Sequence, residues 1–238
     1  MKFKKEMTTH MKRIIPYLII LLLGHGATGQ EIDLYGFYSN GNPDTSFMKL
    51  AQIDPATGTV ENIDSIPGIK AYAMGSSTFD QVNRYFTFVG LDAQWTKRLV
   101  SWDVDEDLIT GQPEVTETIN DLQYDMNTTV YYGIGNYISD TILFDTLTNT
   151  YIFDYASRFL SVDPASGILT EVALLPELKA IPSGGSTFDA NSGRYIVNGI
   201  DPEFNDRLFI IDAATGILLS NELLALDDGD YINELEYN

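Results

Sequence analysis

Two similar stretches of sixteen residues occur in this chain, 109 residues apart, and this repeat constrains the fold more than any other feature. Residues 75–90 read GSSTFDQVNRYFTFVG, and residues 184–199 read GGSTFDANSGRYIVNG. The turn sequence IDPATG at 53–58 returns as VDPASG at 162–167, again after 109 residues. Self-similarity at a fixed period indicates a repeat architecture, in which one structural unit recurs along the chain.

Each 109-residue unit contains a shorter repeat, marked by an Asp-x-x-Thr/Ser-Gly turn. Such turns start at Asp54, Asp163 and Asp212, and a longer version, DVDEDLITG, starts at Asp103. The starts are 49, 60 and 49 residues apart, so four copies of about 50 residues emerge. Between the turns, stretches such as RYFTFV and RLFIID are rich in the aromatic and β-branched residues that favour strands.

Copies of this length with four short strands each are typical of the blades of a β-propeller. The sequence therefore predicts an all-β fold with four four-stranded blades, at 76–119, 120–175, 184–224 and, for the last, 232–238 together with 32–66. The last blade requires the C-terminal strand to pair with the N-terminal strands, which closes the ring. The alternative is a truncated chain, or a partial ring that a partner completes.

The succession LxYD, LYG, IDPxTG, STFD and RL-IDxxTG resembles secreted bacterial β-propeller repeat proteins, and its blade style is similar to that of YVTN and quinoprotein-like propellers. The resemblance covers nearly all of the chain after residue 30. It implies the fold and no activity, because propellers host binding, scaffolding and several unrelated chemistries. No catalytic motif is matched, and no catalytic residue is predicted.

The first 29 residues differ from the rest of the chain. A basic stretch is followed by a mostly apolar run at 14–23 and then by the small residues Ala27 and Gly29. This order predicts a secretory signal peptide at 1–29, followed by a single β-propeller domain at 30–238. We expect a secreted protein, either extracellular, periplasmic or at the cell surface, with no membrane insertion after cleavage. The alternative is an uncleaved N-terminal anchor.

The chain after residue 29 carries 9 basic and 33 acidic residues. This excess argues against nucleic acid and anionic membranes as partners, because both call for basic patches. It permits bound calcium, whose ligands are oxygens. The acids Asp103, Asp105 and Asp107 are the candidates for a metal site, and a solvated acidic turn is the alternative. We thus predict no cofactor, with calcium as the alternative.

Both histidines, His10 and His25, lie in the predicted signal peptide, and the chain has no cysteine. The predicted mature protein therefore lacks Ser-His-Asp and Cys-His chemistry, zinc sites with nitrogen and sulfur ligands, and disulfides. Any catalysis would rest on carboxylates, Tyr, Lys or Arg. A hydrolase that uses a carboxylate pair or calcium in the central channel is therefore the alternative to a binding protein.

Candidate ligand-binding residues cluster in the loops that join second to third strands. Trp95 and Phe204 occupy equivalent positions, in LDAQWTKR and IDPEFNDR, where an aromatic ring can stack on a sugar, anchor a partner or pack on the neighbouring blade. Arg98 and Arg207 begin the following strands, and we expect each to pair with the Asp that precedes the loop. Lys70 and Lys179 form a further matched pair ahead of inner strands.

The loop 136–158 is about twelve residues longer than its counterpart, and long loops carry function more often than short ones. Tyr137, Tyr151 and Tyr155 are its candidates for ligand contact, and its alternating segments at 141–145 and 150–154 predict an extra hairpin. Together these features predict a monomeric, secreted, non-enzymatic β-propeller that binds a protein or glycan partner through loops on one face.

Overall fold

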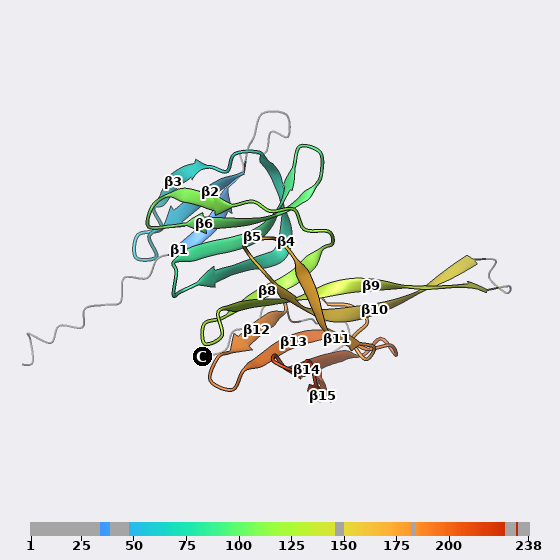
Figure 1. Ribbon diagram of the computed structural model, residues 1–238. Coiled ribbons are helices and arrows are strands. Elements are labelled where there is room, and N and C mark those ends of the chain that lie inside the picture. Colours follow the sequence, from blue (N-terminus) through green and yellow to red (C-terminus); the bar gives the residue numbers. More distant parts are fainter. Residues whose placement is uncertain (1–33, 39–47, 146–149, 182–183, 227–231, 233–238) are drawn as a thin grey trace, which may run out of the picture. The chain divides into compact units, whose positions relative to one another are not determined.

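The computed structural model describes residues 34–38, 48–145, 150–181, 184–226 and 232, and every regular element within these ranges is a β-strand (Figure 1). No segment in these ranges forms an apolar helix of membrane-spanning length. The predicted signal peptide at 1–29 lies outside the described residues, so it stays a prediction.

The strands form antiparallel sheets in which each strand pairs with its neighbours in sequence (Figure 1). The first four-stranded sheet holds β4 (Ile69–Asp80), β5 (Tyr85–Asp92), β6 (Lys97–Asp103) and β7 (Leu108–Gly111). The second holds β8 (Ile119–Asp125), β9 (Val130–Asp145), β10 (Thr150–Val162) and β11 (Leu169–Leu175). The third holds β12 (Ser186–Asp189), β13 (Arg194–Ile200), β14 (Asp206–Asp212) and β15 (Leu218–Leu223). A three-stranded sheet holds β1 (Leu34–Tyr38), β2 (Lys49–Ile53) and β3 (Val60–Ser65).

The chain divides into two compact units. The smaller unit holds residues 34–37 of β1, 50–53 of β2 and 60–63 of β3, and the larger unit holds the three four-stranded sheets. Within the larger unit, the first strand of the second sheet, β8, contacts the first strands of both neighbouring sheets, β4 and β12. Successive four-stranded meanders that meet through their first strands are blades of a β-propeller. The fold is therefore all-β and of the β-propeller type, as the repeat predicts.

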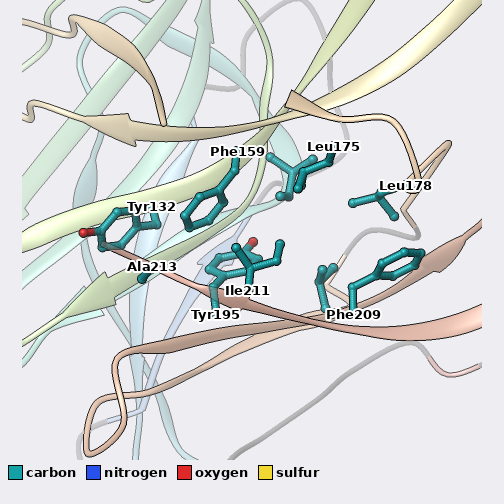
Figure 2. Packing of buried hydrophobic residues seen from close by; sticks show 10 residues of the cluster. Tyr132, Phe159, Leu175, Leu178, Tyr195, Phe209, Ile211 and Ala213 are labelled. Atoms are coloured by element: carbon teal, nitrogen blue, oxygen red, sulfur yellow. The ribbon is translucent and has the colours of Figure 1, made fainter. Parts of the chain in front are cut away.

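The larger of the two apolar clusters among the described residues fills the space between the second and third sheets (Figure 2). Phe159 of β10 is fully buried there, and its ring stacks on Tyr132 of β9 at 5.3 Å and meets Tyr195 of β13 edge-on at 5.1 Å. Phe209 and Ile211 of β14 close the cluster. Because alternate residues of a strand point to one face, this single layer buries the facing sides of both blades.

Aspartates build the tight turns at one end of each four-stranded sheet. At the end of β4, Oδ1 of Asp80 accepts hydrogen bonds from the backbone N–H groups of Val82 and Asn83 at 2.9 and 3.0 Å. Asp212, at the end of β14, caps its turn in the same way, and Gly216 completes that turn with a φ of 71°. Turns of this kind require a residue that tolerates a positive φ, which explains the repeated Asp-to-Gly spacing.

The structure corrects the predicted outer strand of the first blade. The stretch PEVTETI predicts this strand at 113–119. In the structure the strand is Leu108–Gly111; beyond it only residues around Glu114 still pair with β6, through Arg98, and Ile119 already begins the next sheet. The cause is Asp107, which adopts a φ of 52° in the position that Gly216 occupies in the second copy. The turn from Asp103 therefore has the ordinary length, and the interpretation of DVDEDLITG as a stretched turn is wrong.

The predicted extra hairpin is confirmed. β9 and β10 continue together past the other strands of their sheet as a two-stranded ribbon, in which Tyr151 lies opposite Phe144 (Figure 1). By contrast, the closing strand predicted at 232–238 lies outside the described residues apart from Ile232. The backbone carbonyl of Ile232 accepts a hydrogen bond from the Asn198 side chain at 2.6 Å. Closure of the ring stays a prediction.

Candidate binding surface

The turns between the second and third strands of the first and third blades have the same geometry. In the first blade, Oδ1 of Asp92 accepts hydrogen bonds from the backbone N–H groups of Gln94 and Thr96, at 2.9 and 2.8 Å. In the third blade, Oδ1 of Asp201 accepts from the N–H groups of Glu203 and Asn205, at 3.0 and 2.8 Å. In both turns the aspartate side chain therefore holds the backbone of the turn through hydrogen bonds. The two turns, which the repeat predicts to be equivalent, have the same hydrogen bonds.

Each turn places one aromatic residue in the left-handed region of the backbone. Trp95 has a φ of 63° and Phe204 a φ of 65°, a conformation that non-glycine residues adopt at a cost of about 1 kcal/mol or more. Their side chains are 70% and 81% exposed. The alternative that these rings pack on a neighbouring blade is therefore wrong. Each of the two turns therefore exposes one large aromatic ring to solvent from a strained backbone position.

Arginines brace both turns from the adjoining strand, as predicted. Nε of Arg98 donates to Oδ2 of Asp92 at 3.2 Å, and Nε of Arg207 donates to Oδ2 of Asp201 at 2.5 Å. Burial alone would raise the pKa of Asp201, but the hydrogen bonds from Arg207 and Asn205 outweigh it and lower the pKa to about 2. The carboxylate of Asp201 is therefore ionised at neutral pH and engaged on both oxygens.

A third arginine belongs to this series, although the sequence analysis did not single it out. Arg158 lies at the corresponding point of the second blade, where the ribbon of β9 and β10 replaces the short turn. Its guanidinium pairs instead with Glu117 and, at 3.5 Å, with Glu171. The alignment of RFLSVD with RLVSWD and RLFIID is the signal that identifies it.

Beside the Phe204 turn, the surface is hollowed into a pocket of about 500 Å³. Its wall comes from the turn itself, through Asp201, Pro202 and Glu203, and from Arg207 of β14. The remaining wall comes from Pro176 and Glu177 after β11 and from Asn221 of β15. The sequence analysis missed this pocket, because its walls come from segments that are far apart in the chain.

The first copy of the repeat differs at this place. The residues that correspond to Pro176, Glu177, Glu203 and Asn221, 109 positions earlier, are Pro67, Gly68, Gln94 and Gln112. Neither glutamate of the pocket therefore has an acidic counterpart in the first copy. The Gln112 side chain donates to the backbone carbonyl of Pro67 at 3.2 Å and so bridges the two segments. In the third blade the Asn221 backbone carbonyl instead accepts a hydrogen bond from Arg207 at 2.9 Å. The sequence signal for this pocket is the pair of glutamates that the second copy has and the first copy lacks.

The predicted lysines lie at the same sheet ends as the aromatic turns. Lys70 follows Ile69, which pairs with Asp92 across β4 and β5. The backbone N–H of Lys179 donates to the carbonyl of Ile200, directly before Asp201, at 2.7 Å. Both lysines are half-buried. A role for them in ligand binding stays a prediction.

The predicted tyrosines of the second blade belong to the ribbon. Tyr137 pairs with Ala156, and Tyr155 pairs with Ile138, across β9 and β10, while Tyr151 lies nearer the tip. The positions of these side chains lie outside what the structure describes. Their contact with a ligand stays a prediction.

The candidate metal ligands lie in the turn between β6 and β7. Oδ1 of Asp103 accepts hydrogen bonds from the N–H groups of Asp105 and Glu106, both at 3.0 Å, and Asp105 pairs with Arg84 at 3.2 Å. Because the sheet is antiparallel, this turn lies at the opposite end from the Trp95 turn. Within the described ranges, no group of three or more acidic, histidine or cysteine side chains is placed to hold a metal ion.

One buried carboxyl escaped the sequence analysis altogether. Asp121 sits in a bulge of β8 with a φ of 53° and is only 2% exposed. Its Oδ1 accepts a hydrogen bond from the N–H of Gly184 at 2.6 Å, and its backbone carbonyl accepts from the Tyr195 hydroxyl. Burial raises the pKa of Asp121 to about 7, although the hydrogen bonds from Gly184 and Gly185 oppose the shift. The carboxyl links the second blade to the third.

No protein-family model matches the chain, and no curated protein matches it. Several solved structures are similar in fold. They include a glucose dehydrogenase, at 11% identity and a TM-score of 0.49, where the match covers 89% of this chain and 72% of that one. The β-propeller domain of the trilobed protease from Pyrococcus furiosus matches at 11% identity and a TM-score of 0.48, covering 85% and 57%.

The Pyrococcus horikoshii acylaminoacyl peptidase matches at 10% identity and a TM-score of 0.48, covering 80% of this chain and 31% of that one. This chain therefore spans only about a third to three fifths of the two Pyrococcus chains. At such identities and scores, the activities of these proteins carry no argument for this one. The assignment of the propeller fold rests on the blades themselves.

Proposed function

We propose that this protein is a secreted, non-enzymatic β-propeller that captures a protein or glycan partner through the turns between second and third strands. The observation that carries the proposal is the matched pair Trp95 and Phe204. Each ring is mostly exposed and stands on a turn whose backbone would be more relaxed with glycine in the same place. Strain that persists in two copies, and leaves a large apolar side chain in water, is typical of a binding function.

The surrounding contacts support the same function. Each turn is fixed by an aspartate that bonds the turn backbone and by an arginine that bonds the aspartate, so the ring is presented on a rigid support. A preorganised aromatic anchor loses little conformational freedom when it binds, which favours affinity.

The test is capture by the purified protein of immobilised polysaccharides and extracellular proteins, measured by surface plasmon resonance. We expect the double variant Trp95→Ala/Phe204→Ala to bind its partner at least tenfold more weakly. Val82→Ala is the matched control, because Val82 is an apolar residue, 58% exposed, in a turn at the opposite end of the first blade. Unchanged capture by the double variant would contradict the proposal. Turnover of glycans, lactones or phosphate esters by the purified protein would favour a hydrolase instead.

A further inference from the structure

We infer that the pocket beside Phe204 receives a cationic side chain, lysine or arginine, of a protein partner. The inference rests on the proposed function and makes it more specific, because it selects a basic protein segment over a glycan for this site. The pocket, of about 500 Å³, lies within the size range of ligand sites and has room for a long side chain.

The charges in the pocket favour a cation. Arg207 is neutralised by Asp201, with 2.5 Å between Nε and Oδ2, and is bonded further to the Asn221 carbonyl. Glu177 and Glu203 remain as exposed carboxylates, and within the described part of the chain neither side chain has a hydrogen bond or ion pair. The pocket thus carries two uncompensated negative charges, which a neutral ligand would desolvate without compensation.

The Phe204 ring of the same turn also favours a basic side chain. Phe204 does not itself line the pocket, but it directly follows Glu203, which does, and it is 81% exposed. A phenyl face attracts a cation, and it also packs on the aliphatic stem of lysine or arginine. The combination of a hollow, two carboxylates and an exposed ring on the same turn matches the stem and head of a basic side chain.

The first copy of the repeat provides an internal comparison. It keeps the bracing pair Asp92 and Arg98 and the exposed Trp95, but it has Gly68 and Gln94 where the second copy has Glu177 and Glu203. Gln112 also bridges to Pro67 there. The features needed to hold the turn are common to both copies, and the features expected to hold a cation occur in the second alone.

The experiment measures binding of two fluorescent tetrapeptides to the full-length protein, Gly-Lys-Lys-Gly and the same peptide with both lysines Nε-acetylated. Acetylation removes the charge and leaves the stem. We expect the free-lysine peptide to bind at least tenfold more tightly than the acetylated one. The double variant Glu177→Gln/Glu203→Gln should lose that difference.

The control variant is Glu106→Gln/Asp107→Asn, which removes the same two charges from an exposed turn at the opposite end of the first blade. We expect it to weaken binding less than twofold. Equal losses in the two double variants would show a general effect of the acidic surface and would overturn the inference, as would equal binding of the two peptides. If Glu177→Gln/Glu203→Gln does not change peptide binding while Trp95→Ala/Phe204→Ala still abolishes capture of a glycan, the inference fails and the proposed function stands.

Discussion

Asp121 and Gly184 join the second blade to the third through a hydrogen bond of 2.6 Å between a buried carboxylate oxygen and a backbone N–H. The other carboxylate oxygen is buried without a hydrogen-bond partner among the described residues. Burial of a carboxyl group disfavours its charged form, which is the cause of the raised pKa. The seam between these two blades therefore contains a group that titrates near neutral pH.

This raised pKa predicts a pH dependence of stability. The pKa of Asp121 rises from an ordinary value of 3.8 to about 7 on folding, so the folded state binds the proton more tightly than the unfolded state. The stabilisation is fully present below pH 4 and is lost as the pH rises through about 7. Near its steepest, the contribution of this group falls by up to about 1.4 kcal/mol per pH unit.

Asp121→Asn should remove this dependence, because asparagine keeps an acceptor for Gly184, tolerates the positive φ and does not ionise. Urea unfolding from pH 4 to pH 8 measures the effect. We expect the free energy of unfolding of the variant, relative to the wild type, to rise by a few kcal/mol, on the order of 3, across this range. A difference that does not vary with pH would contradict the assignment.

A second prediction concerns Gly167 in the turn between β10 and β11. Its φ is 72°, and a Cβ atom there would lie 2.4 Å from the backbone oxygen of Glu114 in the first blade. Gly167→Ala should therefore combine backbone strain with overpacking and cost about 2–4 kcal/mol. The measurement is the free energy of unfolding in urea.

The matched control is Gly193→Ala. Gly193 has a φ of 63°, but no atom lies within 4 Å of the Cβ position, and Arg84 already adopts a similar φ at the equivalent site of the first copy. We expect a cost of about 1 kcal/mol from the backbone alone. Equal costs for the two variants would show that the Gly167 turn does not pack on the first blade.

The core predicts a third effect. Phe159→Ala should cost about 3–5 kcal/mol, because it leaves a cavity between Tyr132 and Tyr195 and removes both ring contacts. The loss should appear as a lower urea midpoint with an unchanged slope. A cost below 1 kcal/mol would mean that the seam between the second and third blades contributes little to folding.

A fourth prediction concerns calcium. Oδ1 of Asp103 already accepts hydrogen bonds from two backbone N–H groups, and the Asp105 carboxylate forms an ion pair with Arg84. We therefore expect the melting temperature to be the same in excess calcium and in chelator. A rise in calcium that Asp103→Asn and Asp107→Asn abolish would contradict this expectation, because a ligand that binds only the folded state raises its stability.

The blades were predictable from the sequence because each residue type has one dominant local role. The Asp-to-Gly spacing fixes the turns, and the alternation in RYFTFV and RLFIID fixes the strands between them. The pairs Asp92–Arg98 and Asp201–Arg207 were predictable for the same reason, since six residues across a tight turn bring them together. The error at 113–119 arose because Asp107 takes a conformation that the pattern assigns to glycine.

The candidate site was only half predictable. The sequence marks Trp95 and Phe204 as equivalent, but the choice between exposure and packing depends on the neighbouring blade, which no local pattern encodes. The pocket forms only when the segment after β11 meets the turn at Asp201 and the edge strand β15. The buried state of Asp121 likewise depends on contact with Gly184, which lies 63 residues away in the chain.

The central claim is that the two aromatic residues are kept at strained positions for binding, and replacement of both by glycine tests it most directly. The variant Trp95→Gly/Phe204→Gly should relieve the positive-φ strain and raise the free energy of unfolding by about 0.5–1 kcal/mol per site. The same variant should bind its captured partner at least tenfold more weakly. A gain in stability together with lost capture would support the claim. Lower stability with capture intact would show that the rings serve the fold, and would contradict it.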